Sequence, residues 1–333
     1  MTPGTYRSFD PLFAPAMAAK MVELCERFGT YRTYAEERAE IEIGEGLAQR
    51  HDAVSNFLKT GGRFGRKDAI GSLAARTNYF RESYAYGEQI MIDGIEPFLR
   101  YEGFVEGARA IHGRSVIEPA IVYANILVAG QELAVHTDVP EFRGANRKKF
   151  PQWLMVVMHH SGLFDEWRMP IATAVSWFNE CTGGAFAFYP DGADGPAQTL
   201  AAKPNTAVIL DTDSVFHGVD PVGTSGPLAP LRPGMRLTFD GNDRWSVRAG
   251  DEVVGTYRWN EIRFSISWKA YCFADEAERR AWREHSDDLQ LDAIVDRLVA
   301  DLRRRGRITN GRPQATQLAL MMIEEYVRFP VSQ

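Results

Sequence analysis

The stretch IVYANILVAGQELAVHTD, residues 121–138, sets the expected fold. It holds two short apolar runs separated at Gly130, and it ends in His136, Thr137 and Asp138. Similar short runs follow, each bounded by Gly, Pro, Asp or Asn: QWLMVVMHH, IATAVSWFNE, GGAFAFYP, TAVILDTD and SVFHGVD. Closely spaced runs of this kind are typical of a β-sandwich or barrel. We therefore predict a β-barrel core that begins at about residue 115.

Helical patterns flank this β-rich segment on both sides. Before it, apolar residues recur at three- and four-residue spacing, including a candidate helix over 34–58. Within it, a loop rich in proline and glycine and a small meander form an insertion at about 221–260, followed by the strand IRFSISWKAYCF, residues 262–273. We predict an α+β protein in three parts: a mainly helical N-terminal region over 1–114, the core over 115–274, and C-terminal helices over 275–333 that pack on the core.

The composition is that of an ordinary globular chain. The protein has 333 residues, a formal net charge of −6 and a pI near 5.7. An acidic chain lacks the overall basic charge typical of nucleic-acid binding. The cysteines form no close pair, the first residues do not resemble a signal peptide, and polar residues interrupt the longest apolar stretch. We predict a cytoplasmic protein that binds neither nucleic acid nor a membrane, and its oligomeric state stays open.

Three side chains of the β-rich segment have the chemistry of a metal site. His136 and Asp138 stand at i and i+2, a spacing that places both side chains on one side of a strand. His217 lies on another predicted strand, 79 residues after Asp138. Two histidines and one carboxylate on one face of an iron ion leave positions open for a co-substrate and O₂. We therefore predict that these three residues bind Fe(II).

Two further motifs accompany the predicted ligands. Arg263, Phe264 and Ser265 form an RxS pattern on the strand 262–273, and the run GGAFAFYP lies between the two histidine motifs. A guanidinium matches a carboxylate with two parallel hydrogen bonds and stays charged. With these motifs, the chain from roughly 115 to 273 resembles the Fe(II)/2-oxoglutarate-dependent dioxygenase superfamily, in the general style of its prolyl-hydroxylase-like branch.

This resemblance implies a double-stranded β-helix, or jelly-roll, core. It also implies that 2-oxoglutarate chelates the iron, that its far carboxylate pairs with Arg263, and that Ser265 donates a hydrogen bond to that carboxylate. One feature departs from the family pattern, because 46 residues separate His217 from Arg263. Arg232 and Arg236 therefore remain alternative anchors, although Arg232 stands between prolines in a loop, which is a poor platform for this contact.

Two residues upstream of the metal motif are also candidates for the co-substrate site. Tyr123 and Asn125 stand two apart on a predicted strand, so both side chains project from one face. We predict that they form hydrogen bonds with the co-substrate.

The resemblance further implies the reaction class. We predict an enzyme that uses Fe(II), 2-oxoglutarate and O₂ to oxidise an unactivated C–H bond of a small molecule, such as an amino acid or a natural-product intermediate, with release of succinate and CO₂. The predicted outcome is hydroxylation, because halogenating relatives lack the carboxylate that Asp138 supplies. Three alternatives stay open: an iron oxidase that does not use 2-oxoglutarate, an oxygenase acting on protein side chains, and a jelly-roll that binds a ligand without catalysis.

Two other pairs of residues invite a functional interpretation. His159 and His160 end the predicted strand QWLMVVMHH, so one of them is a candidate for lining the pocket. Asp211 and Asp213 precede His217 and look like a metal-binding pair, but we predict that they are turn-forming residues.

Overall fold

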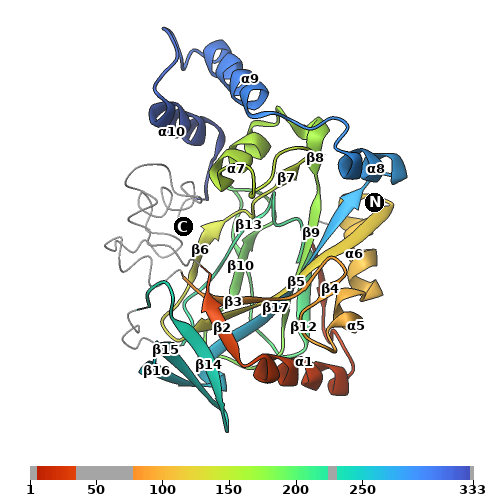
Figure 1. Ribbon diagram of the computed structural model, residues 1–333, viewed down its shortest axis with the longest axis vertical. Helices are drawn as coiled ribbons and strands as arrows, with labels where there is room; N and C mark the ends of the chain where they lie inside the picture. The colour runs from red at the N-terminus through yellow and green to blue at the C-terminus, as the bar shows by residue number, and fades with distance from the viewer. Residues whose placement is uncertain (1–5, 35–77, 224–230, 331–333) are drawn as a thin grey trace.

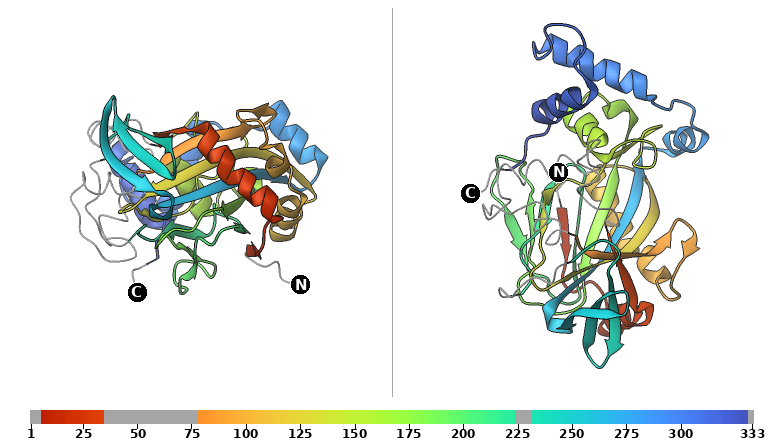
Figure 2. Two further views of the ribbon diagram at one scale, coloured as in Figure 1. Left: turned by 90° about the horizontal axis from the view of Figure 1, so that it is seen from below. Right: turned by 60° about the vertical axis from the view of Figure 1, so that its left-hand side comes forward.

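The computed structural model describes residues 6–34, 78–223 and 231–330. The candidate helix over 34–58 falls almost entirely outside these residues. The described chain folds around two facing β-sheets, with helices at one side and at one end (Figures 1 and 2).

Eight strands form the core, four in each sheet. In the large sheet the order is β12 (Thr206–Leu210), β9 (Ile171–Trp177), β17 (Ile262–Phe273) and β5 (Val116–Val128). In the small sheet it is β11 (Gln198–Leu200), β10 (Phe186–Tyr189), β13 (Phe216–Val219) and β6 (Leu133–His136). All pairings are antiparallel, and the chain passes repeatedly from one sheet to the other. This strand order is that of a double-stranded β-helix, which confirms the predicted fold class.

Both faces of the large sheet contribute to the core, because every residue of β9 and β12 and all but two of β17 are buried. Successive residues of a strand point to opposite faces. On β17, Trp268 and its even-numbered neighbours join the main apolar cluster. The odd-numbered residues of β17 face the small sheet and are polar from Arg263 to Lys269. A polar inner face on a buried strand is the first sign of a site inside the barrel.

Strands from the N-terminal region and from the insertion extend the large sheet. On one edge β1 (Tyr6–Phe9) pairs with β12. Beyond β5 the sheet continues through the strands β3 (Phe80–Tyr86), β2 (Thr30–Thr33), β14 (Arg236–Gly241), β15 (Arg244–Ala249) and β16 (Glu252–Arg258), with β4 (Gln89–Ile90) paired to β3. The strands β14, β15 and β16 form the predicted meander. The N-terminal region thus holds sheet strands as well as helices.

Helices cover the outer face of the large sheet (Figure 1). They are α1 (Pro15–Phe28), α5 (Glu96–Leu99) and α6 (Glu102–His112). Phe104 of α6 packs against Trp268 of β17, with ring centroids 5.5 Å apart. This layer excludes water from the outer face, so the strands of the large sheet are fixed in register beneath the site.

The segment QWLMVVMHH is a helix, so its prediction as a strand was wrong. It forms α7 (Gln152–Ser161), which starts after Pro151 and ends at Gly162 in the left-handed conformation, with φ 67°. Six successive residues, Trp153 to Met158, are buried because the helix is enclosed on several sides. A continuous apolar run does not distinguish a helix buried all round from a buried strand.

The C-terminal helices lie at the end of the barrel where α7 is (Figure 2). They are α8 (Glu276–Glu284), α9 (Leu291–Arg304) and α10 (Ala315–Tyr326). The apolar residues of α9 and α10 share one cluster with those of α7, whereas α8 packs on β17. A short ribbon of β7 (Glu141–Phe142) and β8 (Arg168–Met169) and the 3₁₀ turns Asp165–Trp167 and Trp259–Glu261 complete the described structure. None of the described helices is long and apolar enough to span a bilayer.

Candidate metal centre and co-substrate site

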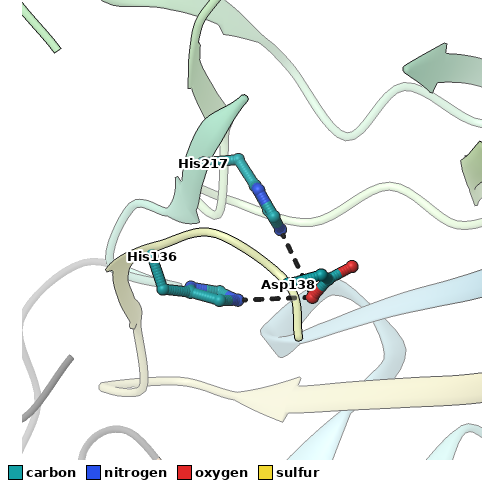
Figure 3. Close-up of side chains that lie close together, drawn as sticks. All are labelled: His136, Asp138 and His217. Atoms are coloured by element: carbon teal, nitrogen blue, oxygen red, sulfur yellow. Dashed lines mark ion pairs between the residues drawn. The ribbon is translucent and has the colours of Figure 1, made fainter. Parts of the chain in front are cut away.

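The two histidines of the predicted metal site are direct neighbours on the small sheet. β6 and β13 pair antiparallel, and His136 and His217 are cross-strand partners. Their ring centroids lie 4.5 Å apart. Asp138 follows β6 by two residues, and its backbone N–H donates to the Thr212 carbonyl at 2.8 Å, which ties it to the turn before β13. The sheet therefore brings all three side chains to one point (Figure 3).

Both imidazoles are oriented by their own strands. Nδ1 of His136 lies 2.7 Å from the Ala134 carbonyl, and Nδ1 of His217 lies 2.9 Å from the Val215 carbonyl. A carbonyl can only accept, so Nδ1 carries the proton and Nε2 is left with its lone pair. The two Nε2 atoms lie 3.7 and 3.8 Å from Oδ1 of Asp138. The three ligand atoms lie within 4.8 Å of one another.

The electrostatics of the site keep Asp138 and His217 in their ligand forms. Burial opposes ionisation of Asp138, but Lys269 and the two histidines outweigh it and hold the pKa of the carboxyl well below its usual range. Burial, helped by the neighbouring His136, lowers the pKa of His217 to about 4, so its ring is neutral at pH 7. A carboxylate and neutral imidazoles are the forms that bind metals.

Lys269 is a functional residue that sequence reasoning missed. Its Nζ lies 2.7 Å from Oδ2 of Asp138, so one carboxylate oxygen is held by the lysine and Oδ1 remains directed at the histidines. Lys269 stands six residues after Arg263 on β17, which places both on the inner face. The two-residue alternation of RFSISWK contained this signal, because a lysine on a buried strand needs a partner.

The three-residue site fits a divalent iron ion. Two nitrogens and one oxygen, contributed from one side, form the donor set that non-haem Fe(II) uses with other positions open. The hydrogen bonds to Nδ1 and the Lys269 contact to Oδ2 are the outer contacts that orient metal ligands in proteins. The arrangement thus supplies both the three metal donors and the contacts that hold these donors in place.

Arg263 lies on the inner face of the same barrel, fully buried. Its Nε donates to the Gly184 carbonyl at 2.7 Å, and its Nη1 donates to Ser265 Oγ at 3.2 Å. Its Nη2 is buried without a partner in the described chain. Burial lowers the pKa of Arg263 to about 10, so the side chain is still charged at pH 7. The alternatives Arg232 and Arg236 are both exposed on the side of the meander.

Gly184 makes room for this arginine. It has φ +65°, which L side chains rarely adopt, and a Cβ there would come within 2.8 Å of Arg263 Cδ. The GGAFAFYP run therefore serves the site through its backbone, since Gly184 both cradles the guanidinium stem and accepts its Nε–H.

Three buried polar atoms without partners surround Ser265. Ser265 is the cross-strand partner of Asn125 on one side and of Trp177 on the other. Within the described residues, Asn125 Oδ1, Trp177 Nε1 and Arg263 Nη2 have no hydrogen-bond partner. Buried polar groups in native proteins are almost always satisfied, so such a group points to a missing ligand or water. This cluster is therefore a candidate site for a polar ligand inside the barrel.

The remaining predicted contact, Tyr123, occupies the next position on β5. It is the cross-strand partner of Ser267 and is 6% exposed. The guanidinium of Arg81, on β3, lies 3.6 Å above the centre of its ring. The structure therefore places Tyr123 on the inner face, beneath the guanidinium of Arg81.

The adjacent histidines lie on α7 outside the set of metal donors. His159 Nε2 lies 3.1 Å from Ser214 Oγ, and His160 stacks on Phe216 with ring centroids 5.4 Å apart. Asp211 behaves as a turn residue that pairs with Arg168 at 2.8 Å.

Asp213 stands in the same turn, but its side chain is fully buried. Its carboxyl oxygens have no partner among the described residues. Burial and Asp211 raise the pKa of Asp213 to about 8, so it is mostly neutral at pH 7.

A groove of about 350 Å³ continues the inner face beyond the metal centre. Ile121, which lines it, is the cross-strand partner of Lys269, and Tyr271 follows Lys269 by two residues. The opposite wall comes from the loop after Asp138, through Arg147, and from α8, through Trp282. A volume of this order is that of a small-molecule pocket.

Comparisons with known proteins give similar solved structures only. No protein-family model matches the chain, and no curated protein matches it. Similar structures include a Pseudomonas putida prolyl-4-hydroxylase, with 10% identity over 81% of this chain and 94% of that one, and a TM-score of 0.40. They also include a prolyl hydroxylase from Trichoplax adhaerens, with 9% identity over 84% and 87% of the two chains, and a TM-score of 0.41.

A third similar structure is HygX from Streptomyces hygroscopicus with nickel, 2-oxoglutarate and hygromycin B bound, with 8% identity over 81% and 84% of the two chains, and a TM-score of 0.40. Similarities of this size carry no conclusion about activity. A proposal about activity rests instead on the strand order, the metal site and the buried polar atoms of this chain.

Proposed function

We propose that this protein is an Fe(II)- and 2-oxoglutarate-dependent oxygenase that oxidises a C–H bond of a small molecule. The observation that carries the proposal is the pairing of two sites inside one double-stranded β-helix. One is the three-residue metal site, and the other is the unpartnered guanidinium of Arg263. When bound, Fe(II), 2-oxoglutarate and O₂ would supply the oxidising chemistry: one atom of O₂ would enter the substrate and the other succinate, with release of CO₂.

The metal-binding part needs no rearrangement. His136, Asp138 and His217 would hold Fe(II), with both Nε2 atoms and Oδ1 already directed to one point. Lys269 would keep Asp138 bound through a single oxygen, because its Nζ occupies Oδ2. That leaves positions on the far side of the ion for other ligands.

Binding of 2-oxoglutarate would explain why the charged guanidinium of Arg263 is buried. The far carboxylate of 2-oxoglutarate would pair with Arg263 and accept a hydrogen bond from Ser265. The indole N–H of Trp177 lies beside this position and would satisfy its own hydrogen-bonding need there. Asn125, across the strand from Ser265, would contact the same ligand through its amide N–H groups, because its Oδ1 and the carboxylate both only accept. The contacts to Arg263 Nη2 and Trp177 Nε1 supply an acceptor to a buried donor that otherwise has none in the described chain.

The groove next to Lys269 supports a small-molecule substrate. It opens on the inner face close to the metal ligands, and aromatic and basic side chains line it. The loop after Asp138 and helix α8 would enclose the substrate there and limit the access of water. Hydroxylation is the outcome we propose, since Asp138 supplies the third protein ligand.

The experiment is a measurement of 2-oxoglutarate binding that does not depend on the substrate. Protein loaded with Ni(II), which does not turn over, is titrated with 2-oxoglutarate in a calorimeter. We expect one binding site per chain that requires the metal. A substrate screen read by succinate formation follows, with free amino acids and their derivatives first. Wild-type protein that binds neither metal nor 2-oxoglutarate would exclude the proposed function.

A further inference from the structure

A second arginine lies on the inner face of the large sheet. Arg81 of β3 is the cross-strand partner of Asn125, which is itself paired to Ser265 of β17. The three residues therefore form one row across three adjacent strands. Because cross-strand partners point to the same face, the side chain of Arg81 starts on the face that carries the co-substrate site. It is partly buried in the described structure.

The guanidinium of Arg81 is held by aromatic rings. It lies 3.6 Å from the ring centre of Tyr123 and 5.2 Å from that of Tyr34. Tyr34 in turn stacks on Tyr79, with ring centroids 5.0 Å apart and planes 8° from parallel. Tyr79 takes one side-chain hydrogen bond from Arg81. Stacking uses the faces of a guanidinium and leaves the other N–H groups at its edge available for a ligand.

Arg81 has no carboxylate partner in the described residues, unlike other arginines nearby. Arg32, the cross-strand partner of Arg81, is paired with Glu82 at 2.6 Å. On the opposite side of the barrel, Arg168 is paired with Asp211 at 2.8 Å. An arginine held between rings and left without an anion is typical of a binding site for carboxylate or phosphate.

This arginine lies on the same inner face as the metal-site lysine. Tyr123, under the guanidinium, is the cross-strand partner of Ser267, which stands two residues before Lys269 on β17, and Lys269 holds Asp138. Burial and the neighbouring phenols raise the pKa of Tyr79, so its hydroxyl stays protonated and can donate a hydrogen bond. A ligand at Arg81 would therefore lie beside the iron ligands rather than at a remote surface.

The charges of the site favour an anionic substrate. Arg81, Arg263 and Lys269 are cationic, and Asp138 is the one ionised acid among the inner-face residues named above. Asp213 is mostly neutral at pH 7 because its pKa is raised to about 8. Fe(II) and the 2-oxoglutarate dianion cancel each other, so positive charge remains in excess after both have bound.

We infer that Arg81 binds an anionic group of the substrate, a carboxylate or a phosphate, beside the metal centre, with the edge of its guanidinium. This inference rests on the proposed function and adds the substrate class. The two arginines then bind different ligands: Arg263 binds the far carboxylate of 2-oxoglutarate, and Arg81 binds the anionic group of the substrate.

The test compares charged compounds with neutral ones that have the same shape. Protein loaded with Ni(II) and 2-oxoglutarate is screened by thermal shift, then by calorimetry, against aliphatic, aromatic and amino carboxylic acids, each paired with its primary amide. Phosphate monoesters paired with their alcohols form a second arm. We expect acids to bind and amides to bind at least about tenfold more weakly, as expected for the loss of a charged hydrogen bond. Binding of the phosphates instead supports the same subsite with phosphate as its ligand.

Variants then assign the effect to one side chain. We expect Arg81→Gln to weaken binding of the preferred anion about tenfold to a hundredfold, with the Kd for 2-oxoglutarate unchanged. The affinity of Arg81→Lys for the anion should lie between those of the wild type and Arg81→Gln, because lysine keeps the charge but cannot form two parallel hydrogen bonds. Arg109→Gln is the matched control, since it removes an exposed arginine on α6 that pairs with Glu102.

Three results would overturn the inference while leaving the proposed function intact: amides that bind as tightly as acids, a wild-type protein that binds no anion of the panel, or an Arg81→Gln variant that weakens 2-oxoglutarate binding instead. Failure of 2-oxoglutarate to bind the Ni(II)-loaded wild type is a different outcome, and it removes the proposed function itself. The acid–amide comparison needs no variant, so it tests the substrate class even if Arg81→Gln does not fold, and Arg81→Lys then tests the assignment to this side chain.

Discussion

Replacing Arg263 with methionine separates the stability of the protein from its affinity for 2-oxoglutarate. The guanidinium is 2% exposed, and its Nη2 has no partner in the described chain. Methionine fills most of the same space and removes a buried charge, which favours the folded state. It also removes the hydrogen bond to the Gly184 carbonyl, which opposes that gain. We expect the free energy of unfolding without ligand to change by no more than about 1–2 kcal/mol.

The effect on 2-oxoglutarate binding should be much larger. The natural side chain offers the far carboxylate Nη2 and, through Ser265, a hydroxyl that Nη1 holds in place. Charged hydrogen bonds contribute about 1.5–3 kcal/mol each, so the loss of two costs roughly 3–6 kcal/mol. That corresponds to about a hundredfold to ten-thousandfold increase in the Kd for 2-oxoglutarate. Chelation of the metal remains and sets the residual affinity.

Calorimetry on Ni(II)-loaded protein measures the Kd, and thermal unfolding of the metal-free protein measures stability. Arg232→Met is the matched control, because Arg232 is exposed and stands in the loop that sequence analysis left as an alternative. An unchanged Kd for Arg263→Met, or a larger increase for Arg232→Met, would refute the assignment. A variant that loses several kcal/mol of stability would show instead that the guanidinium is needed by the fold.

Three further outcomes test the site and its surroundings. His136→Ala or His217→Ala should abolish stoichiometric Fe(II) binding under anaerobic conditions while the circular dichroism spectrum is unchanged; full metal occupancy in either contradicts the ligand assignment. Lys269→Met should weaken Fe(II) binding about tenfold to a hundredfold, because Oδ2 of Asp138 loses the contact that orients it, and a metal titration against a competing chelator measures this. Asp301→Asn should destabilise the protein by about 1–2 kcal/mol at pH 7, since the buried carboxylate accepts a hydrogen bond from Tyr326 at 2.7 Å. Hydrogen bonds from Tyr326 and Arg305 outweigh burial and hold the pKa of Asp301 below its usual value. The contribution of the Asp301 carboxylate to stability is therefore present above the unfolded pKa near 4, and it is lost as the pH falls through the lower folded pKa. Urea unfolding at pH 7 and pH 3 should show the difference between wild type and variant shrinking, and a constant difference would contradict it.

The core fold and the metal residues were accessible from the sequence because local rules determine them. His136 and Asp138 are two apart, and the β-rich runs have the length and punctuation of barrel strands. That the two histidines are cross-strand partners was not accessible, because pairing of β6 with β13 is a property of the folded sheet. The same applies to the row from Arg81 to Ser265, which joins residues far apart in the chain.

The errors have physical causes too. The α7 segment is apolar on every side because it is enclosed between the barrel and the C-terminal helices, so its period of 3.6 residues is hidden. Lys269 lies on a strand that was predicted from its apolar residues. Arg81 lies in a region that was predicted to be mainly helical. Their roles depend on Asp138 and Tyr123, which no local pattern places beside them.

The position of β17 has a consequence for how the molecule forms. It is the last strand in the described part of the chain, yet it lies in the middle of the large sheet between β5 and β9. Until residues 262–273 have been synthesised, β5 and β9 each present an unpaired edge, and unpaired edges promote aggregation. The strand that closes this gap also carries Arg263 and Lys269. Synthesis therefore completes the hydrogen-bonding of the sheet and the positive charge of its inner face in a single event, and a chain truncated before residue 262 would keep both open edges and lack both basic side chains.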